Sequence, residues 1–211
     1  AGATVGDSGA ATLTVDSGGS FTVADSLDVA ASAGSSGSIV IDGGLLTVAA
    51  DARLGDGGDG SLTLSAGGTV QIIGTLTEGV QSGSSGTLLA DDPADQFSIG
   101  GDWTIGVAGA HSDTLQGGLS ADVSGALALG AQSGGAGTLT LSGLSSTLSV
   151  EGATLAVGGG GTGSLHLADG ASLSAFSASL TAGASAGATG VIALDGANST
   201  LTIGHDLTLG D

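Results

Sequence analysis

The 211-residue chain contains no cysteine, no methionine and no tyrosine, and it has a single proline. Without cysteine it can form neither disulfides nor thiolate metal sites. No apolar run reaches the length of a membrane span, and the chain does not begin with a basic and then apolar export signal. We therefore expect no direct membrane insertion of this segment, and we expect any targeting or anchoring parts to lie outside these residues.

Positive charge is almost as scarce, because the chain has one arginine, Arg53, and no lysine, against twenty acidic residues. A net charge of -19 disfavours nucleic acid and anionic membrane surfaces as partners, and it favours solubility and association with cations. Enzymes of β-helical fold that cleave acidic polysaccharides combine clustered carboxylates with a basic residue. Since this chain offers only one arginine, we expect it to be non-catalytic.

The sequence does contain a repeat of short strands in which apolar and polar residues alternate, seen most clearly between Gly134 and Gly158. Its first strand can be followed along the chain by one leading apolar residue in each copy. These residues are Leu13, Ile39, Leu62, Leu88, Leu115, Leu139, Leu165 and Ile192. Their spacing of 23 to 27 residues is typical of a solenoid and predicts eight coils of about 26 residues.

A second marker is the small residue that closes the third strand of every copy. These residues are Ala30, Gly55, Gly79, Gly106, Gly130, Gly158, Gly183 and Gly210. Glycine recurring at one phase indicates a backbone bend, often at positive φ. Alternate apolar residues of each strand should then line one interior, so the sequence predicts an all-β fold: a parallel β-helix in a single domain spanning residues 1–211.

The repeat is less regular over about residues 91–126. Asp91, Asp92, Pro93 and Asp95 separate the first two strands of coil four, so we expect a longer, acidic loop there and interpret it as a binding loop. Trp103 should occupy an inward column otherwise held by leucine, as a structural residue.

The segments at 137–143, 146–150, 155–158 and 196–204 resemble the repeats of bacterial type V secretion (autotransporter passenger) and PEP-CTERM-associated surface proteins. The resemblance covers essentially the whole chain. It implies a right-handed parallel β-helix that is extracellular or on the bacterial cell surface. It further implies an adhesin or scaffold whose partners are other surface proteins or glycans, although a fold does not fix a function.

The charged residues outside the acidic loop have plain interpretations. Asp28 and Arg53 share one outward position of adjacent coils, so we expect a structural ion pair. His111, His166 and His205 fall at different phases, in a loop, an outward strand position and a turn, and we interpret them as surface residues.

Three further acidic residues, Asp16, Asp42 and Glu78, are more informative. Asp16 and Asp42 occupy the same turn in neighbouring coils, where they either point apart into water or share a cation such as calcium, the one cofactor that the sequence suggests. Glu78 shares an inward column with Leu54 and Ile105, and because burying a lone carboxylate is costly, we expect a one-residue slip or bulge that exposes it.

Two functions are consistent with this sequence. The first is a structural scaffold or adhesin segment, and the second is a self-assembling fibre subunit that associates end to end. The residues Thr4 to Asp7 have the same phase as Thr208 to Asp211, which is compatible with either function.

Overall fold

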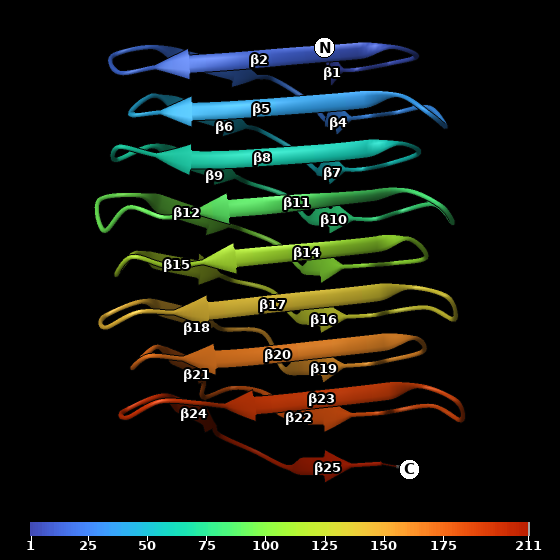
Figure 1. The fold of residues 1–211 in the computed structure, drawn as a ribbon, viewed down its shortest axis with the longest axis vertical. Helices are drawn as coiled ribbons and strands as arrows, with labels where there is room; N and C mark the ends of the chain where they lie inside the picture. The colour runs from blue at the N-terminus through green and yellow to red at the C-terminus, as the bar shows by residue number, and fades with distance from the viewer. Residues whose placement is uncertain (211) are drawn as a thin grey trace.

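The computed structural model describes residues 1–210 and shows a β-solenoid whose coils stack along one axis (Figure 1). The described residues form 25 strands and no helix. The strands lie in three parallel sheets, one for each strand of the coil. Stacked at about 4.8 Å per coil, eight coils give a rod roughly 38 Å long. The predicted fold class is confirmed, and Asp211 lies outside the described residues.

Each sheet collects one strand from every coil, and we name the sheets accordingly. The first-strand sheet consists of β2 (Ala10–Asp16), β5 (Ser36–Asp42), β8 (Asp59–Ser65), β11 (Ser85–Ala90), β14 (Ala110–Leu115), β17 (Ala136–Ser142), β20 (Thr162–Ala168) and β23 (Thr189–Leu194). The second-strand sheet consists of β3 (Ser20–Val23), β6 (Leu45–Val48), β9 (Thr69–Ile72), β12 (Gln96–Ile99), β15 (Ser120–Val123), β18 (Thr147–Val150), β21 (Ser172–Ala175) and β24 (Thr200–Ile203). The third-strand sheet consists of β1 (Ala3–Val5), β4 (Leu27–Val29), β7 (Ala52–Leu54), β10 (Leu76–Glu78), β13 (Trp103–Ile105), β16 (Leu127–Leu129), β19 (Thr154–Val157), β22 (Ser179–Ala182) and β25 (Leu207–Leu209).

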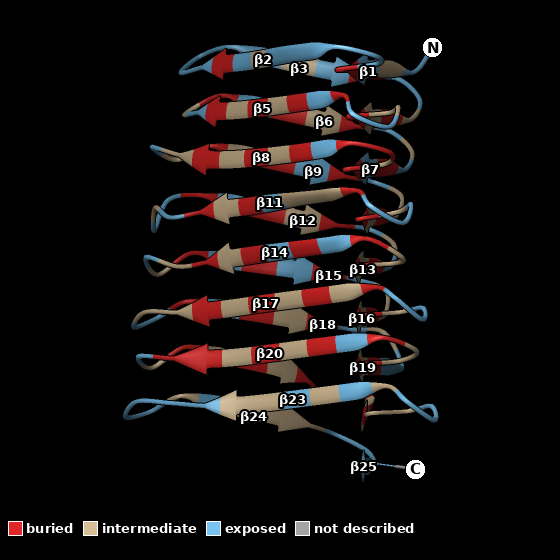
Figure 2. Ribbon diagram, turned by 45° about the vertical axis from the view of Figure 1, so that its right-hand side comes forward, coloured by how far each residue is buried: buried red, intermediate tan, exposed pale blue. Residues whose placement is uncertain are grey.

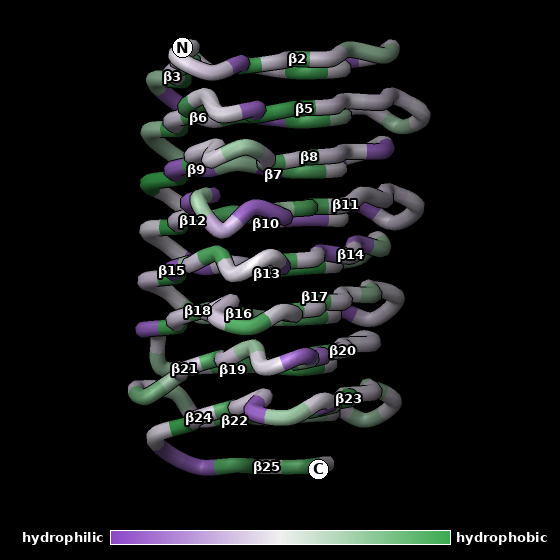
Figure 3. The backbone as a smooth tube through the Cα atoms, turned by 60° about the vertical axis from the view of Figure 1, so that its left-hand side comes forward, coloured by the Kyte–Doolittle hydropathy of each residue, from purple (hydrophilic) through white to green (hydrophobic). Residues whose placement is uncertain are grey.

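The interior is a set of apolar columns produced by the two-residue period of the strands. Hydrophobic positions recur at the same place in successive coils, while β10 carries a hydrophilic segment (Figure 3). The central coils are buried along the inward positions, and the first and last coils are more exposed (Figure 2). Trp103 is completely buried between Leu76 and Leu127, as predicted.

The corner after each third strand has the backbone that the sequence predicts. All eight closing residues have positive φ, from 56° at Ala30 to 72° at Gly158. Glycine adopts this conformation without steric cost, which explains its recurrence at this phase. Ala30 is the one non-glycine residue in the set, and it is buried.

The irregular region keeps the register of the rest of the molecule. β14 and β15 pair in parallel with the strands of coils four and six, even though their sequence matches the repeat poorly. One prediction is wrong here: the residue that aligns with Leu88 and Leu139 is Asp113, and Leu115 aligns with Ala90 and Leu141. The prediction assigns Leu115 in place of Asp113 because an aspartate in an inward column interrupts the series of apolar residues that marks this strand.

Candidate functional site

The most unusual part of the interior is the corner where the third-strand sheet meets the first-strand sheet near coils three to five. Glu78 is the last residue of β10, and its neighbours in the column are Leu54 and Ile105. The predicted slip that would expose Glu78 is wrong, because its side chain is fully buried. Its register follows from Gly79, which closes the corner at a φ of 59° like its counterparts in other coils.

His111 and Asp113 reach the same corner from β14, the first strand of coil five. Both side chains are fully buried, so the surface role expected for His111 is wrong. His111 aligns with Gly86 and Gly137, in a column that is glycine in most other coils. A β-carbon built on Gly86 would collide with the imidazole of His111, so the glycine of coil four makes room for this ring.

The three side chains contact one another around the Nδ1 atom of His111. This atom lies 2.9 Å from Oδ1 of Asp113 and 3.3 Å from Oε2 of Glu78. The backbone N–H of Leu88 donates to the same Oδ1 of Asp113 over 3.0 Å. We call Glu78, His111 and Asp113 the buried triad.

Several polar atoms of the buried triad have no hydrogen-bond partner among the described residues. They are both carboxylate oxygens of Glu78, Oδ2 of Asp113 and Nε2 of His111, and the indole nitrogen of Trp103 is unpartnered as well. Burial raises the pKa of Glu78 well above its usual range, and the nearby carboxylate of Asp113 raises it further. The ionised form of Glu78 is therefore disfavoured unless a positive charge joins it.

The acidic loop of coil four is ordered by one of its own residues. Asp95 is only 2% exposed, and its two carboxylate oxygens accept hydrogen bonds from the backbone N–H groups of Gly67, Gly68, Asp91 and Asp92 over 2.9 to 3.2 Å. Burial raises the pKa of Asp95 and these hydrogen bonds lower it, with a net rise. Asp95 therefore stabilises the loop from within. It also borders the surface groove of this loop, and the binding role expected for it stays a prediction.

Pro93, Ala94 and Asp95 of the loop form one wall of a surface groove of about 710 Å³. Pro93 and Ala94 stand beside outward side chains of β9, β12 and β15, among them Gln71, Ser98 and Asp122. Asp91 is exposed and Asp92 half-buried, and Asp92 accepts a hydrogen bond from the backbone of Ala94 over 2.8 Å. The loop thus borders a polar groove, and its binding role stays a prediction.

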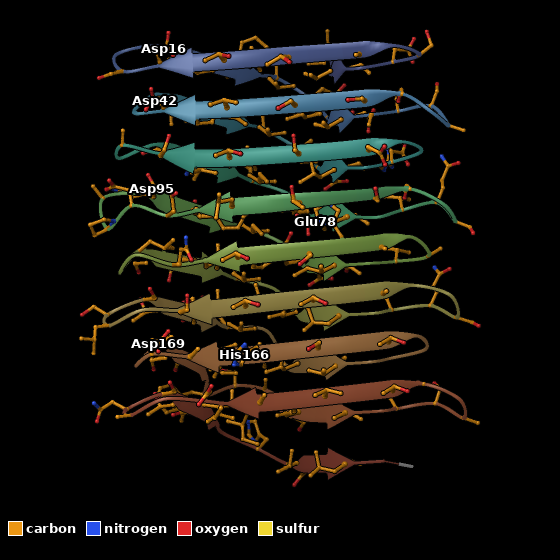
Figure 4. All side chains as sticks on the ribbon, viewed as in Figure 1. Asp16, Asp42, Glu78, Asp95, His166 and Asp169 are labelled. Carbon is orange, nitrogen blue, oxygen red and sulfur yellow. The ribbon has the colours of Figure 1, made fainter. Side chains whose placement is uncertain are left out.

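The other predicted site residues lie apart from this region. Arg53 and Asp28 are register neighbours joined by a 3.2 Å ion pair, as predicted. Asp16 and Asp42 are exposed register neighbours at the same end of β2 and β5 (Figure 4). Because calcium takes six to eight oxygen ligands, two carboxylates alone would leave most of its coordination to water, and a calcium role stays a prediction.

The sequence does contain a signal for His111 and Asp113. A glycine stands two residues before the leading apolar residue in six coils, namely Gly37, Gly60, Gly86, Gly137, Gly163 and Gly190. Spacing this second column evenly places His111 and Asp113 inward. For Glu78 the sequence predicts the correct column, and only the cost of burying a carboxylate argues for a slip.

Comparisons with protein-family models, with curated proteins and with solved structures found no match to this chain. None of the described residues belongs to a helix of the length and apolarity that crossing a membrane requires. Any functional conclusion therefore depends on the geometry and chemistry of the chain's own residues.

Proposed function

We propose that the chain is a structural segment of an extracellular or bacterial cell-surface protein, a rigid acidic rod that spaces or displays other parts and performs no catalysis. The observation that carries this proposal is the continuity of the three sheets. Every coil pairs in register with the next, including across the irregular coils four and five. Such a ladder resists bending because each coil is hydrogen-bonded to its neighbours in three sheets.

The sequence repeats that resemble autotransporter passengers and PEP-CTERM-associated proteins support the same location. Outward positions carry mainly small polar and acidic side chains, as in Thr12, Thr14 and Asp28, which suit a surface in contact with water. Antibody labelling of intact producing cells tests the location. Labelling without permeabilisation is expected, and labelling that requires lysis would contradict the proposal.

The polar groove of coil four is the contact surface that an adhesin function would use. Gln71, Ser98 and Asp122 present amide, hydroxyl and carboxylate groups that can hydrogen-bond a glycan. A glycan array with the wild type and with Gln71→Ala/Asp122→Ala tests this role. Binding lost in the variant supports an adhesin, and equal binding by both proteins removes the groove from consideration.

A self-assembling fibre subunit is the second candidate, favoured by the apolar residues of the last coil. Leu194, Leu207 and Leu209 are at least half exposed, so a second copy could cover them. The third-strand sheet has nine strands whereas the other two have eight, and β1 and β25 are its two edges. Copies stacked in all three sheets would therefore place β25 of one copy and β1 of the next at the same position, and one of them must move aside.

Light scattering and negative-stain microscopy of the purified chain, with and without millimolar calcium, separate these two functions. Dispersed short rods are expected for the structural segment. Filaments one solenoid wide would favour the fibre subunit, and deleting residues 1–6, which removes β1, should then lengthen them. Filaments that form only with calcium would also support the cation role predicted for Asp16 and Asp42.

A further inference from the structure

Each member of the buried triad is an exception in its own column. Glu78 occupies a column of nine register positions in which the other eight residues are Val, Leu, Ile or Ala. Asp113 replaces the Leu or Ile found in the other coils, and His111 replaces Gly or Ala. Three exceptions that meet at one point indicate a selected site, because each alone is costly to bury.

The spacing of the triad fits a metal ion. One potential ligand atom from each residue lies within 4.8 Å of the other two. The distances of 2.9 Å and 3.3 Å from Nδ1 of His111 to the two carboxylates are close to the separation of roughly 3.3 Å between ligands of a tetrahedral zinc ion. Small shifts of these side chains would therefore bring one nitrogen and two oxygens to coordination distance.

The unpartnered atoms show what the site lacks. The oxygens of Glu78 and Oδ2 of Asp113 are buried acceptors, and the described residues provide them with no donor. Without an ion, the triad is electrically neutral only when it holds two protons beyond a pair of carboxylates and a neutral imidazole. One divalent cation supplies the same charge and, unlike protons, also occupies several oxygens at once.

We propose that Glu78, His111 and Asp113 form a buried binding site for a divalent transition-metal ion such as Zn²⁺. The donor set of one imidazole and two carboxylates suits zinc, which accepts nitrogen and oxygen ligands at low coordination number. Calcium and magnesium fit less well, because calcium needs six to eight oxygens and magnesium retains several waters. The N–H of Leu88, which donates to Oδ1 of Asp113, would hold this carboxylate in its orientation toward the ion.

The ion would join coils that do not pair directly. Glu78 belongs to coil three, whereas His111 and Asp113 belong to coil five, so a shared ion would connect them past coil four. Since all three side chains are fully buried, the ion would enter while the chain folds or through a local opening. The site would thus act as an internal staple of the rod, a role independent of the proposed surface function.

The test is to refold the full chain with Zn²⁺ or with a chelator and to measure bound metal after gel filtration by mass spectrometry. We expect one zinc per chain and an unfolding midpoint higher by roughly 5–10 °C when free zinc is about 100-fold above its dissociation constant. Refolding with Co²⁺ should give the visible absorption of a low-coordinate site.

The chain itself supplies the control that removes the site without leaving an unpaired charge. Glu78→Leu/His111→Gly/Asp113→Leu places in each column the residue type found in other coils, so this variant should fold. It should bind no zinc and show no zinc-dependent shift. His166→Ala/His205→Ala removes the two histidines outside the triad and should bind zinc like the wild type.

The proposal is overturned if the wild type retains no zinc and its midpoint does not respond. It is equally overturned if Glu78→Leu/His111→Gly/Asp113→Leu retains as much zinc as the wild type, which would place binding on surface carboxylates. Zinc lost only in the His166→Ala/His205→Ala variant would assign the metal to those histidines and contradict the triad.

Discussion

Two equivalent corners of the solenoid differ in chemistry but not in backbone. The corner of the buried triad consists of Glu78, His111 and Asp113, and the corner two coils further on consists of Leu129, Gly163 and Leu165. The residues that close them, Gly79 and Gly130, have φ values of 59° and 63°. The turn glycines and the strand ladder therefore determine the coil, and the polar triad is not required for the fold.

The largest effect is expected when one charged residue is placed in the apolar corner. Leu129→Glu buries a carboxylate in a corner whose other two positions hold Gly163 and Leu165, and we expect it to lower the free energy of unfolding by about 4 kcal/mol or more. Urea denaturation monitored by circular dichroism measures this. Leu129→Met, which changes shape but not polarity, is the control and should cost less than about 1.5 kcal/mol. A mild effect of Leu129→Glu would show that this corner tolerates charge.

The next largest effect concerns side-chain size. Trp103 fills a column position that leucine holds in the coils before and after it, at Leu76 and Leu127. Its ring packs edge-on against Phe97 with centroids 5.4 Å apart. Trp103→Ala should cost about 3–5 kcal/mol through the cavity that it leaves. Trp103→Leu restores the residue of the column and should cost clearly less in the same denaturation experiment, and equal costs would mean that cavity size is not the cause.

Making the polar corner apolar should have the opposite effect on stability. In the presence of a chelator, Glu78→Leu/His111→Gly/Asp113→Leu should raise the free energy of unfolding by about 1–4 kcal/mol, because well-packed apolar residues replace buried charges. His111→Gly alone should instead destabilise, since two carboxylates would then face each other. A triple variant less stable than the metal-free wild type would show that the triad stabilises the fold unaided.

The acidic loop offers a smaller test of how the irregular region stays in register. Asp95→Ala removes the acceptor for four backbone N–H groups, and we expect a loss of about 1–3 kcal/mol. Hydrogen exchange should accelerate at Gly67, Gly68, Asp91 and Asp92 and not at distant strands. Asp91→Ala, on the exposed side of the same loop, is the matched control and should leave both quantities unchanged.

The smallest effect is expected at the surface ion pair of Arg53 and Asp28, whose side chains are 48% and 26% exposed. Arg53→Gln should cost at most about 1 kcal/mol, and the difference from the wild type should shrink in high salt. Thermal melts at low and high ionic strength measure it. A large loss that does not depend on salt would point to packing of the arginine stem instead of charge.

The sequence predicts the fold well because its two markers, the leading apolar residue and the small closing residue, report the same physical constraints, and because the closing residue keeps the register in coil five, where the apolar marker fails. It predicts the triad poorly because His111 and Asp113 have neither marker. The nearby Leu115 is apolar and is therefore assigned as the leading residue of this strand. Glu78 illustrates the other limit. The sequence places it in the correct column, but the cost of its burial can be judged only when the partners from β14 are known.

The parallel ladder also has a mechanical consequence. Because the hydrogen bonds of the three sheets connect each coil to the next along the rod, force applied at the two ends of the chain would detach coils one after another from the ends inward. Each detached coil would release about 26 residues, or roughly 90 Å of extended chain. The rod is thus stiff under small loads and extensible under large ones, dissipating energy in steps of one coil.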